Sequence, residues 1–333
     1  MSCTFVGDRA HRSAHGAGPQ SVWLVCLSIS ASSLLSLPGL AQDLGHQLVP
    51  LIEAHAGQVA VAVKHLDTGR SFFYQADRIM PTASLIKVAV MLEVYQQVEE
   101  GRISLSEPVT LRQEDKVPGS GILTEHFSVG ARFPLRDAVR LMIAFSDNTA
   151  TNMVLDRVGL AAVNKRMEAW GFAETKIHSK VFRRDTSLYP ERSRRYGLGS
   201  TTAREMLALL EKLHHRQLVS AAASAEMLEH LKKCTDRDKF PRLLPAGTTV
   251  AHKTGSVSDA RNDAGILYTP GGPIALCVLT AGNRDTSWTQ DNAGDVLCAR
   301  IARVVYDVFN PGKASPPGTI EGRPAGGVVP SAK

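Results

Sequence analysis

The chain has 333 residues, of which 44% are hydrophobic and 21% charged, both ordinary values for a globular protein. This length accommodates one large domain or two closely joined domains. The net charge is +6, but the basic residues are scattered, without a dense Lys/Arg block or an alternation of basic and aromatic residues. Nucleic acid is therefore not expected as a partner.

The N-terminal stretch is typical of an export signal. Arg9 and Arg12 precede an apolar stretch over residues 22–37, and Ala41 offers a cleavage point. We expect a signal peptide over residues 1–41, a periplasmic or secreted mature protein, and no stable membrane insertion after cleavage. The alternative is an uncleaved anchor, which the short apolar stretch disfavours.

Cleavage at this point would leave three cysteines, Cys234, Cys277 and Cys298. At most one disulfide can then form within the chain, and we favour Cys277 with Cys298, although sequence alone does not establish the pair. The cysteine spacing matches no zinc-site pattern. We expect neither a metal nor a cofactor.

The first third of the chain predicts two strands between two helices. Periodicity and turn residues place these four elements over residues 44–56, 59–63, 71–74 and about 84–100. The last of them contains an apolar run too long for a strand and ends before Gly101, which is why we expect a buried helix there.

The middle of the chain predicts helices, and the last third returns to strands. Helical spacing places five helices over residues 134–145, 149–158, 161–170, 202–213 and 224–233. Strands are expected over residues 248–255, 263–268 and 274–280, followed by a helix at about 291–309 and a disordered tail over 311–333. Two stretches predict irregular structure, residues 101–130 and the arginine-rich residues 180–200.

This order of elements predicts an α/β (α+β) fold. Strands near both chain ends would form one antiparallel sheet flanked by helices, with an all-helical domain inserted between them. We expect the sheet domain over residues 42–80 and 222–310, and the helical domain over residues 81–221.

Ser84 and Lys87 form the first motif with chemical meaning. Because residues three apart share a helix face, a hydroxyl and an amine would lie side by side at a helix N-terminus. A desolvated lysine can act as the base that makes a serine nucleophilic. The plain alternative is a helix cap at Ser84 and a surface charge at Lys87, and S-x-x-K alone does not decide between them.

Two further motifs follow in order, Ser146-Asp147-Asn148 and Lys253-Thr254-Gly255. Each has a structural explanation of its own, as a helix cap or turn and as a solvated strand edge. Together with Ser84-x-x-Lys87, however, they describe a single acyl-transfer centre, and this ordered triplet characterises class A β-lactamases and penicillin-binding proteins.

The chain resembles class A β-lactamases and their serine-hydrolase relatives over roughly residues 44–309. Residues 243–255 and the sequence Thr201-Thr202-Ala203 are particularly similar. The resemblance implies the β-lactamase/transpeptidase-like fold, a monomer, and a β-lactam or peptidoglycan-like small-molecule substrate. It implies that Ser84 forms an acyl-enzyme, that Lys87 relays its proton, and that Ser146 protonates the leaving nitrogen.

The resemblance also assigns substrate contacts. It implies that Asn148 binds the substrate's side-chain amide and that Lys253, Thr254 and Gly255 form the strand edge holding the substrate carboxylate. The backbone N–H groups of Ser84 and Ser256 would form the oxyanion hole.

One departure from the family pattern concerns the acid that activates the deacylating water, a glutamate in the family. The best match here is Asp185, two residues after Arg183 and three before Leu188, with Tyr189 where the family usually has asparagine. Asp185 is one methylene shorter, and a surface ion pair is the alternative. Glu191 is a rival whose surroundings fit the pattern less well.

Three functions therefore stay open at this point. The first is β-lactam hydrolysis, the second a D-Ala-D-Ala peptidase, and the third a sensor that β-lactams acylate without turnover. Motifs of other enzymes, G-x-S-x-G, G-x-G-x-x-G, the P-loop and H-E-x-x-H, are absent from the sequence. His252 is expected to pack or hydrogen-bond rather than to catalyse.

Overall fold

Runs of valine and small apolar residues build the central sheet of the computed structural model, which describes residues 39–312. The sheet has five antiparallel strands in the order β2-β1-β10-β9-β8. Their bounds are Ser71–Tyr74, Gln58–His65, Gly272–Ala281, Ala260–Thr269 and Thr249–Val257. Val61 of β1 lies opposite Val278 of β10, so the two chain ends meet in one sheet, and the predicted fold class is confirmed.

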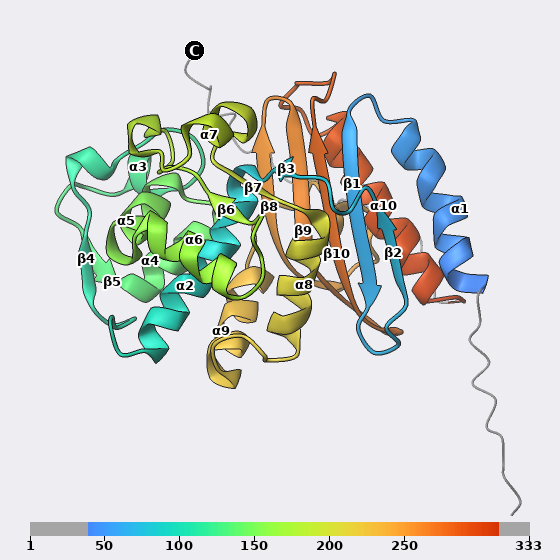
Figure 1. Ribbon diagram of the computed structural model, residues 1–333, viewed down its shortest axis with the longest axis horizontal. Coiled ribbons are helices and arrows are strands. Elements are labelled where there is room, and N and C mark those ends of the chain that lie inside the picture. The colour runs from blue at the N-terminus through green and yellow to red at the C-terminus, as the bar shows by residue number, and fades with distance from the viewer. Residues whose placement is uncertain (1–38, 313–333) are drawn as a thin grey trace, which may run out of the picture. The chain divides into compact units, whose positions relative to one another are not determined.

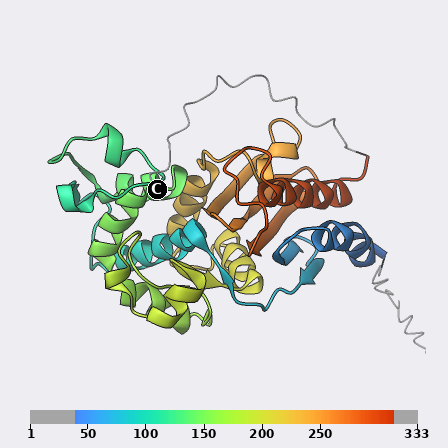
Figure 2. The ribbon, with the colours of Figure 1, turned by 90° about the horizontal axis from the view of Figure 1, so that it is seen from above.

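The sheet separates two hydrophobic cores. Along β1 the side chains alternate between the faces, so Val61 and Val63 belong to one core whereas Ala60 and Ala62 belong to the other. Helices α1 (Gly39–Glu53) and α10 (Ala293–Phe309) cover the valine side. Helix α8 (Ala203–His214) packs on β1 and β10 from the opposite side, as Figures 1 and 2 show.

The helical part is organised around α2 (Lys87–Glu99), which is buried on nearly every side. A helix that is apolar all round needs neighbours on all sides. Here they are α4 (Leu135–Ala144), α5 (Asn148–Val158), α6 (Leu160–Ala169) and α9 (Ala221–Lys232). The helices expected from periodicity are therefore present, with ends displaced by a few residues.

Several short elements fall in stretches that predicted irregular structure. Helix α7 (Pro190–Tyr196) and strand β7 (Gly199–Thr201) lie within or at the end of residues 180–200. Pro190 at the first helical turn favours α7 there because its fixed φ suits a helix start. Strand β4 (Pro108–Thr110) and helix α3 (Leu123–His126) lie within residues 101–130. The remaining short strands are β3 (Met80–Pro81), β5 (Arg132–Pro134) and β6 (Lys176–Ile177), and there are four single-turn 3₁₀ helices among the described residues.

The disulfide favoured from sequence is contradicted by the structure. Cys234, Cys277 and Cys298 are all buried free thiols. Cys277 belongs to the core on one side of the sheet and Cys298 to the core on the other. The intervening sheet therefore keeps the two sulfur atoms apart.

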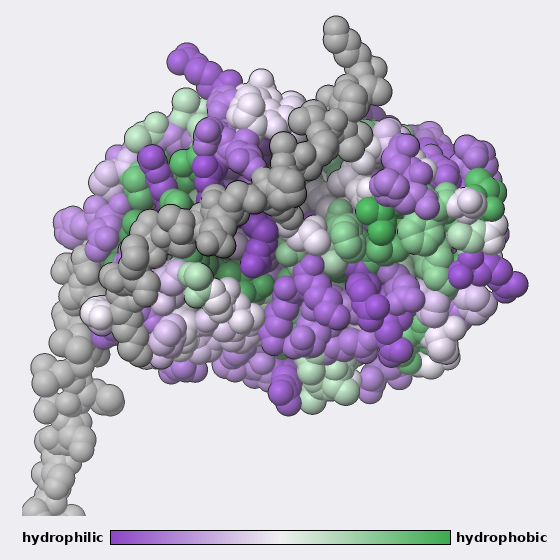
Figure 3. All heavy atoms as spheres, turned by 180° about the vertical axis from the view of Figure 1, so that it is seen from behind, coloured by the Kyte–Doolittle hydropathy of each residue, from purple (hydrophilic) through white to green (hydrophobic). Residues whose placement is uncertain are grey.

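The predicted leader, residues 1–41, and the predicted tail, residues 311–333, fall almost wholly outside the described residues. The division into a sheet domain and a helical domain stays a prediction, since the chain from Pro38 onward clusters as one compact unit. Across residues 39–312, no helix is both long and apolar enough to cross a bilayer. The face seen in Figure 3 intermixes polar and apolar side chains.

Candidate active site

Ser84 lies in a tight turn immediately before α2. This 3₁₀ turn, η1, spans Ala83–Ile86, and Ser84 is partly exposed between buried neighbours. Ala83 has φ of 45°, a conformation that costs energy for a residue with a side chain and is often found at functional sites. The turn thus presents one hydroxyl outward from an otherwise buried segment.

Strand β8 lies directly against this turn. A Cβ atom added to Gly255 would come within 2.2 Å of Thr82 O and 3.1 Å of Ser84 N. Only a glycine permits so close an approach between two backbones. The glycine of the third motif therefore brings the strand edge carrying Lys253 and Thr254 next to Ser84.

Lys87 is fully buried and joins the first motif to the second. Its Nζ donates to Ser146 O at 2.7 Å and to Asn148 Oδ1 at 2.9 Å, and lies 3.2 Å from Ser146 Oγ. Burial, and then the positive charge of Lys253, lower the pKa of Lys87 well below its ordinary value. A lysine held in this way is poised to lose its proton and act as a base.

Asp147 holds the second motif in place. Its carboxylate accepts hydrogen bonds from the backbone N–H groups of Ile122, Leu123 and Ala150 at 2.7–2.8 Å. The last of these is the N-cap bond of α5. Asp147 is thus the helix cap that the sequence offered as the structural explanation of this motif, and it fixes Ser146 and Asn148 on either side of it.

Ser146 lies between two lysines. Lys253, also fully buried, donates from Nζ to Ser146 Oγ at 3.1 Å and to Thr254 O at 2.8 Å. With Lys87 3.2 Å away on its other side, the Ser146 oxygen accepts from amines, so its own proton is available to a substrate atom. Burial lowers the pKa of Lys253, while the negative charges of Cys234 and Asp236 oppose this.

These groups open onto a cavity of about 340 Å³. Its walls include Ser120, Ser146, Lys253 and Thr254. Ser120 donates to Ser146 O at 2.7 Å, a role that the sequence did not reveal because residues 118–121 showed only turn chemistry. Asn148 faces the same loop, with its Nδ2 donating to Pro118 O at 3.0 Å.

The structure does not bring Asp185 into this cluster. Its side chain is 65% exposed, and its carboxylate lies 3.3 Å from Nε and Nη2 of Arg183. The hydrogen bond from Arg183 lowers the pKa of Asp185. Glu191 is also at the surface, where it pairs with Arg194. The assignment of the deacylating base therefore stays a prediction.

Val181, at the start of the arginine-rich residues 180–200, is hydrogen-bonded to helix α5. Asn152, one turn after Asn148 on α5, bonds both backbone groups of Val181, at 2.8 Å to its N–H and 3.0 Å to its carbonyl oxygen. Phe182 follows with φ of 57° and 63% exposure. A Cβ on Gly119 would lie 3.4 Å from the Phe182 ring. Sequence reasoning missed this clamp because it depends on pairing across 29 residues.

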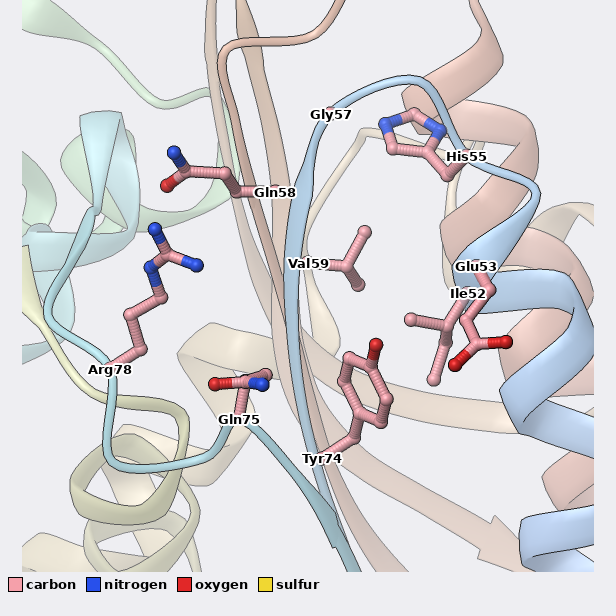
Figure 4. Close-up of a pocket in the computed structure, with 9 residues that line it drawn as sticks. All are labelled: Ile52, Glu53, His55, Gly57, Gln58, Val59, Tyr74, Gln75 and Arg78. Atoms are coloured by element: carbon pink, nitrogen blue, oxygen red, sulfur yellow. The ribbon is translucent and has the colours of Figure 1, made fainter.

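A second pocket lies away from these motifs, between α1, β1 and the segment after β2. Figure 4 shows Gln58 and Arg78 on one side of β1 and His55, Glu53 and Tyr74 on the other. These side chains do not point toward one another. The cluster formed by the three motifs is therefore the better candidate for a reaction centre. No group of three His, Cys, Asp or Glu side chains within residues 39–312 is placed to hold a metal ion.

The comparisons with known proteins identify the family of the chain. The family described as the beta-lactamase enzyme family matches residues 43–309. The extended-spectrum β-lactamase PER-1 of Pseudomonas aeruginosa is 24% identical, covering 84% of this chain and 93% of its own. A β-lactamase of Streptomyces fradiae is 27% identical, covering 86% and 92%.

Solved structures agree with this likeness. The β-lactamase from Sphaerobacter thermophilus superposes with a TM-score of 0.70 and 29% identity, covering 81% of this chain and 97% of its own. PBP-A superposes with a TM-score of 0.70 and 26% identity, covering 82% and 96%. The family match covers most of the chain and includes all three motifs, so the protein belongs to the β-lactamase enzyme family, as a serine β-lactamase of the class A type.

Proposed function

We propose that the protein opens β-lactam rings through an acyl-enzyme on Ser84. The observation that carries this proposal is the hydrogen-bond network from Lys87 to Ser146 and on to Lys253. In this network Lys87 is the proposed base for Ser84, Ser146 is the hydroxyl that can donate a proton, and Lys253 is the cation that can bind an anionic substrate.

The proposed acylation uses these groups in sequence. Lys87 takes the proton of Ser84 as the serine oxygen attacks the lactam carbonyl, and the carbon–nitrogen bond then breaks. Ser146 gives its proton to the departing nitrogen and regains one through Lys87. Lys253 and Thr254 hold the substrate carboxylate, Asn148 binds the side-chain amide, and the N–H groups of Ser84 and Ser256 receive the oxyanion.

The test is the mass of the intact protein after mixing with penicillin G. The parent is expected to gain the mass of one penicillin, and Ser84→Ala is expected to gain none while keeping its circular-dichroism spectrum. Ser106→Ala is a matched control, since Ser106 is an exposed serine whose hydroxyl bonds only Ser104 among the described residues. An undiminished adduct on Ser84→Ala would show that another residue is the nucleophile.

A second candidate function is acylation with slow turnover. It is favoured because no carboxylate among the described residues bonds Lys87, Ser146 or Ser84, and Asp185 faces Arg183 instead. A relative with a similar fold, PBP-A, has been solved as a single-residue mutant in an acyl-enzyme complex with penicillin G. An adduct that persists for hours would favour this function, and a transient one would favour hydrolysis. Release of D-alanine from a D-Ala-D-Ala peptide, measured alongside, would identify a peptidase.

A further inference from the structure

The wall of the active-site cavity contains a thiol that the proposed acyl-transfer chemistry does not use. Cys234, two residues after α9, lines the cavity of about 340 Å³ together with Ser146, Lys253 and Thr254. It is 6% exposed. A small molecule that enters the cavity can therefore meet Cys234 and the substrate-binding groups at the same place.

A fixed imidazole lies beside this thiol. His252 is fully buried on β8, and its Nδ1 is held by Asp263 Oδ1 at 2.9 Å and Oδ2 at 3.1 Å. Its Nε2 is buried and finds no hydrogen-bond partner of ordinary geometry among the described residues. The positive charge of this imidazole acts on the Cys234 thiol, while Asp263 holds the ring through Nδ1.

Charge distinguishes Cys234 from the other two cysteines. Burial alone raises the pKa of the Cys234 thiol, but the positive charges of His252 and Lys253 outweigh it and the pKa is lowered. Burial, and then the negative charge of Asp263, raise the pKa of Cys277 and of Cys298 well above the ordinary value. The reactive form of a cysteine is its thiolate, so one of three buried sulfurs is activated.

The His252 imidazole is correspondingly held in its charged form. Burial by itself lowers the pKa of His252, but Asp263 and then Cys234 raise it to about 10. The charged imidazole in turn favours the thiolate form of Cys234, whose pKa it lowers. Nearby, Asp236 also lines the cavity and is paired with Lys239 at 2.9 Å, so its charge is largely compensated.

We propose that Cys234 is a modification site for small uncharged disulfides, and that the group attached to it occupies the cavity beside Ser146 and Lys253 and stops acylation at Ser84. The modification stands independently of the proposed function. Only its effect on acylation rests on the assignment of Ser84.

The exchange balances without a further reagent. The Cys234 thiolate attacks one sulfur of the small disulfide, a new S–S bond forms to Sγ, and the disulfide's own S–S bond breaks. The departing thiolate takes up the proton of the His252 imidazolium. Cys234 is oxidised, the incoming disulfide is reduced, and an added thiol reverses the exchange.

The test uses 2-hydroxyethyl disulfide on the folded chain, with the labelled cysteine identified by peptide mass mapping. Cys234 is expected to form its mixed disulfide at least about ten times faster than Cys277 or Cys298, which act as internal controls within the same molecule. Labelling of Cys277 or Cys298 ahead of Cys234 would overturn the proposal. His252→Asn should slow the labelling of Cys234, and the internal comparison still decides if that variant does not fold.

The effect on the cavity is tested by adding penicillin G after labelling. The labelled parent is expected to lose at least about 90% of its adduct formation and to recover it after treatment with dithiothreitol. Cys234→Ser treated in the same way should acylate at its own untreated rate. Labelled protein that acylates normally would refute the blocking role. If untreated protein neither forms an adduct nor hydrolyses penicillin G, the Ser84 assignment fails, while the labelling result still decides the thiol site.

Discussion

Lys87 is the residue whose environment differs most from that of an ordinary surface lysine. It has no water-exposed surface, and its three contacts are with uncharged oxygen atoms. Burial favours the neutral amine because the charged form loses its hydration. The buried amine of Lys87 therefore loses its proton more readily than an exposed lysine does.

This environment predicts the pH dependence of acylation. Because burial and Lys253 lower the pKa of Lys87, acylation should persist far below the ordinary lysine pKa of about 10.4. It should fall as pH drops through the lowered pKa, where the base becomes protonated. The rate of adduct formation with penicillin G, measured between about pH 5 and pH 10, checks this. A rate that appears only near the ordinary lysine pKa would contradict it.

Asp185 supports a second prediction at this scale. If Asp185 is the deacylating base, Asp185→Asn leaves acylation nearly unchanged and slows adduct decay by about 10²–10⁴-fold, the usual contribution of general-base assistance. Because its carboxylate now faces Arg183, the loop must rearrange before it can act. Adduct decay is followed by mass spectrometry, with Glu191→Gln measured alongside as the test of the rival carboxylate. Equal decay in Asp185→Asn and the parent would exclude Asp185.

At the scale of elements, the site depends on how closely β8 approaches the turn before α2. Gly255 faces the backbone of Thr82 and Leu85, where a Cβ atom would lie 2.2 Å and 2.9 Å from their atoms. Thr82 O and Leu85 N are backbone atoms, so neither can move aside easily. The distance between the strand and Ser84 is therefore set by the absence of one side chain.

Gly255→Ala is accordingly expected to lower the rate of acylation by about 10²-fold, the usual effect of a displacement of about 1 Å at a reacting centre. The added methyl group pushes the strand away from the turn while most of the sheet stays paired. Gly45→Ala is the control, because its Cβ would make an ordinary 3.7 Å contact with Phe72. Stopped-flow acylation rates decide, and an unchanged rate in Gly255→Ala would refute the argument.

Elements and motifs that are local in sequence could be predicted. The long helices, the sheet strands and the three motifs follow from periodicity and from residues a few positions apart. The positive φ of Ala83 and the Asn152–Val181 clamp could not, because both are imposed by packing between distant segments. The predicted disulfide between Cys277 and Cys298 was wrong for the same reason, because only the folded sheet places them on opposite faces.

At the scale of the whole molecule, the predicted leader bears on where the protein acts. We expect export, with a mature chain that begins near Gln42, because two arginines and an apolar stretch precede Ala41. N-terminal sequencing of periplasmic or secreted protein checks this. A full-length chain retained in the cytoplasm would contradict it. Leu27→Arg places a charge within the apolar stretch and should block export, which tests whether that stretch acts as the signal.

The pairing of β1 with β10 has a consequence for the newly made chain. Lys253 reaches Ser146 across 107 positions, and β9 and β10, which hold β8 against the first strands, are made after it. A ribosome-bound or translocating chain that stops before residue 281 contains Ser84 and Lys87 but no closed sheet. We therefore expect penicillin encountered during synthesis or secretion to meet an incomplete centre, with acylation starting only once β10 has paired with β1.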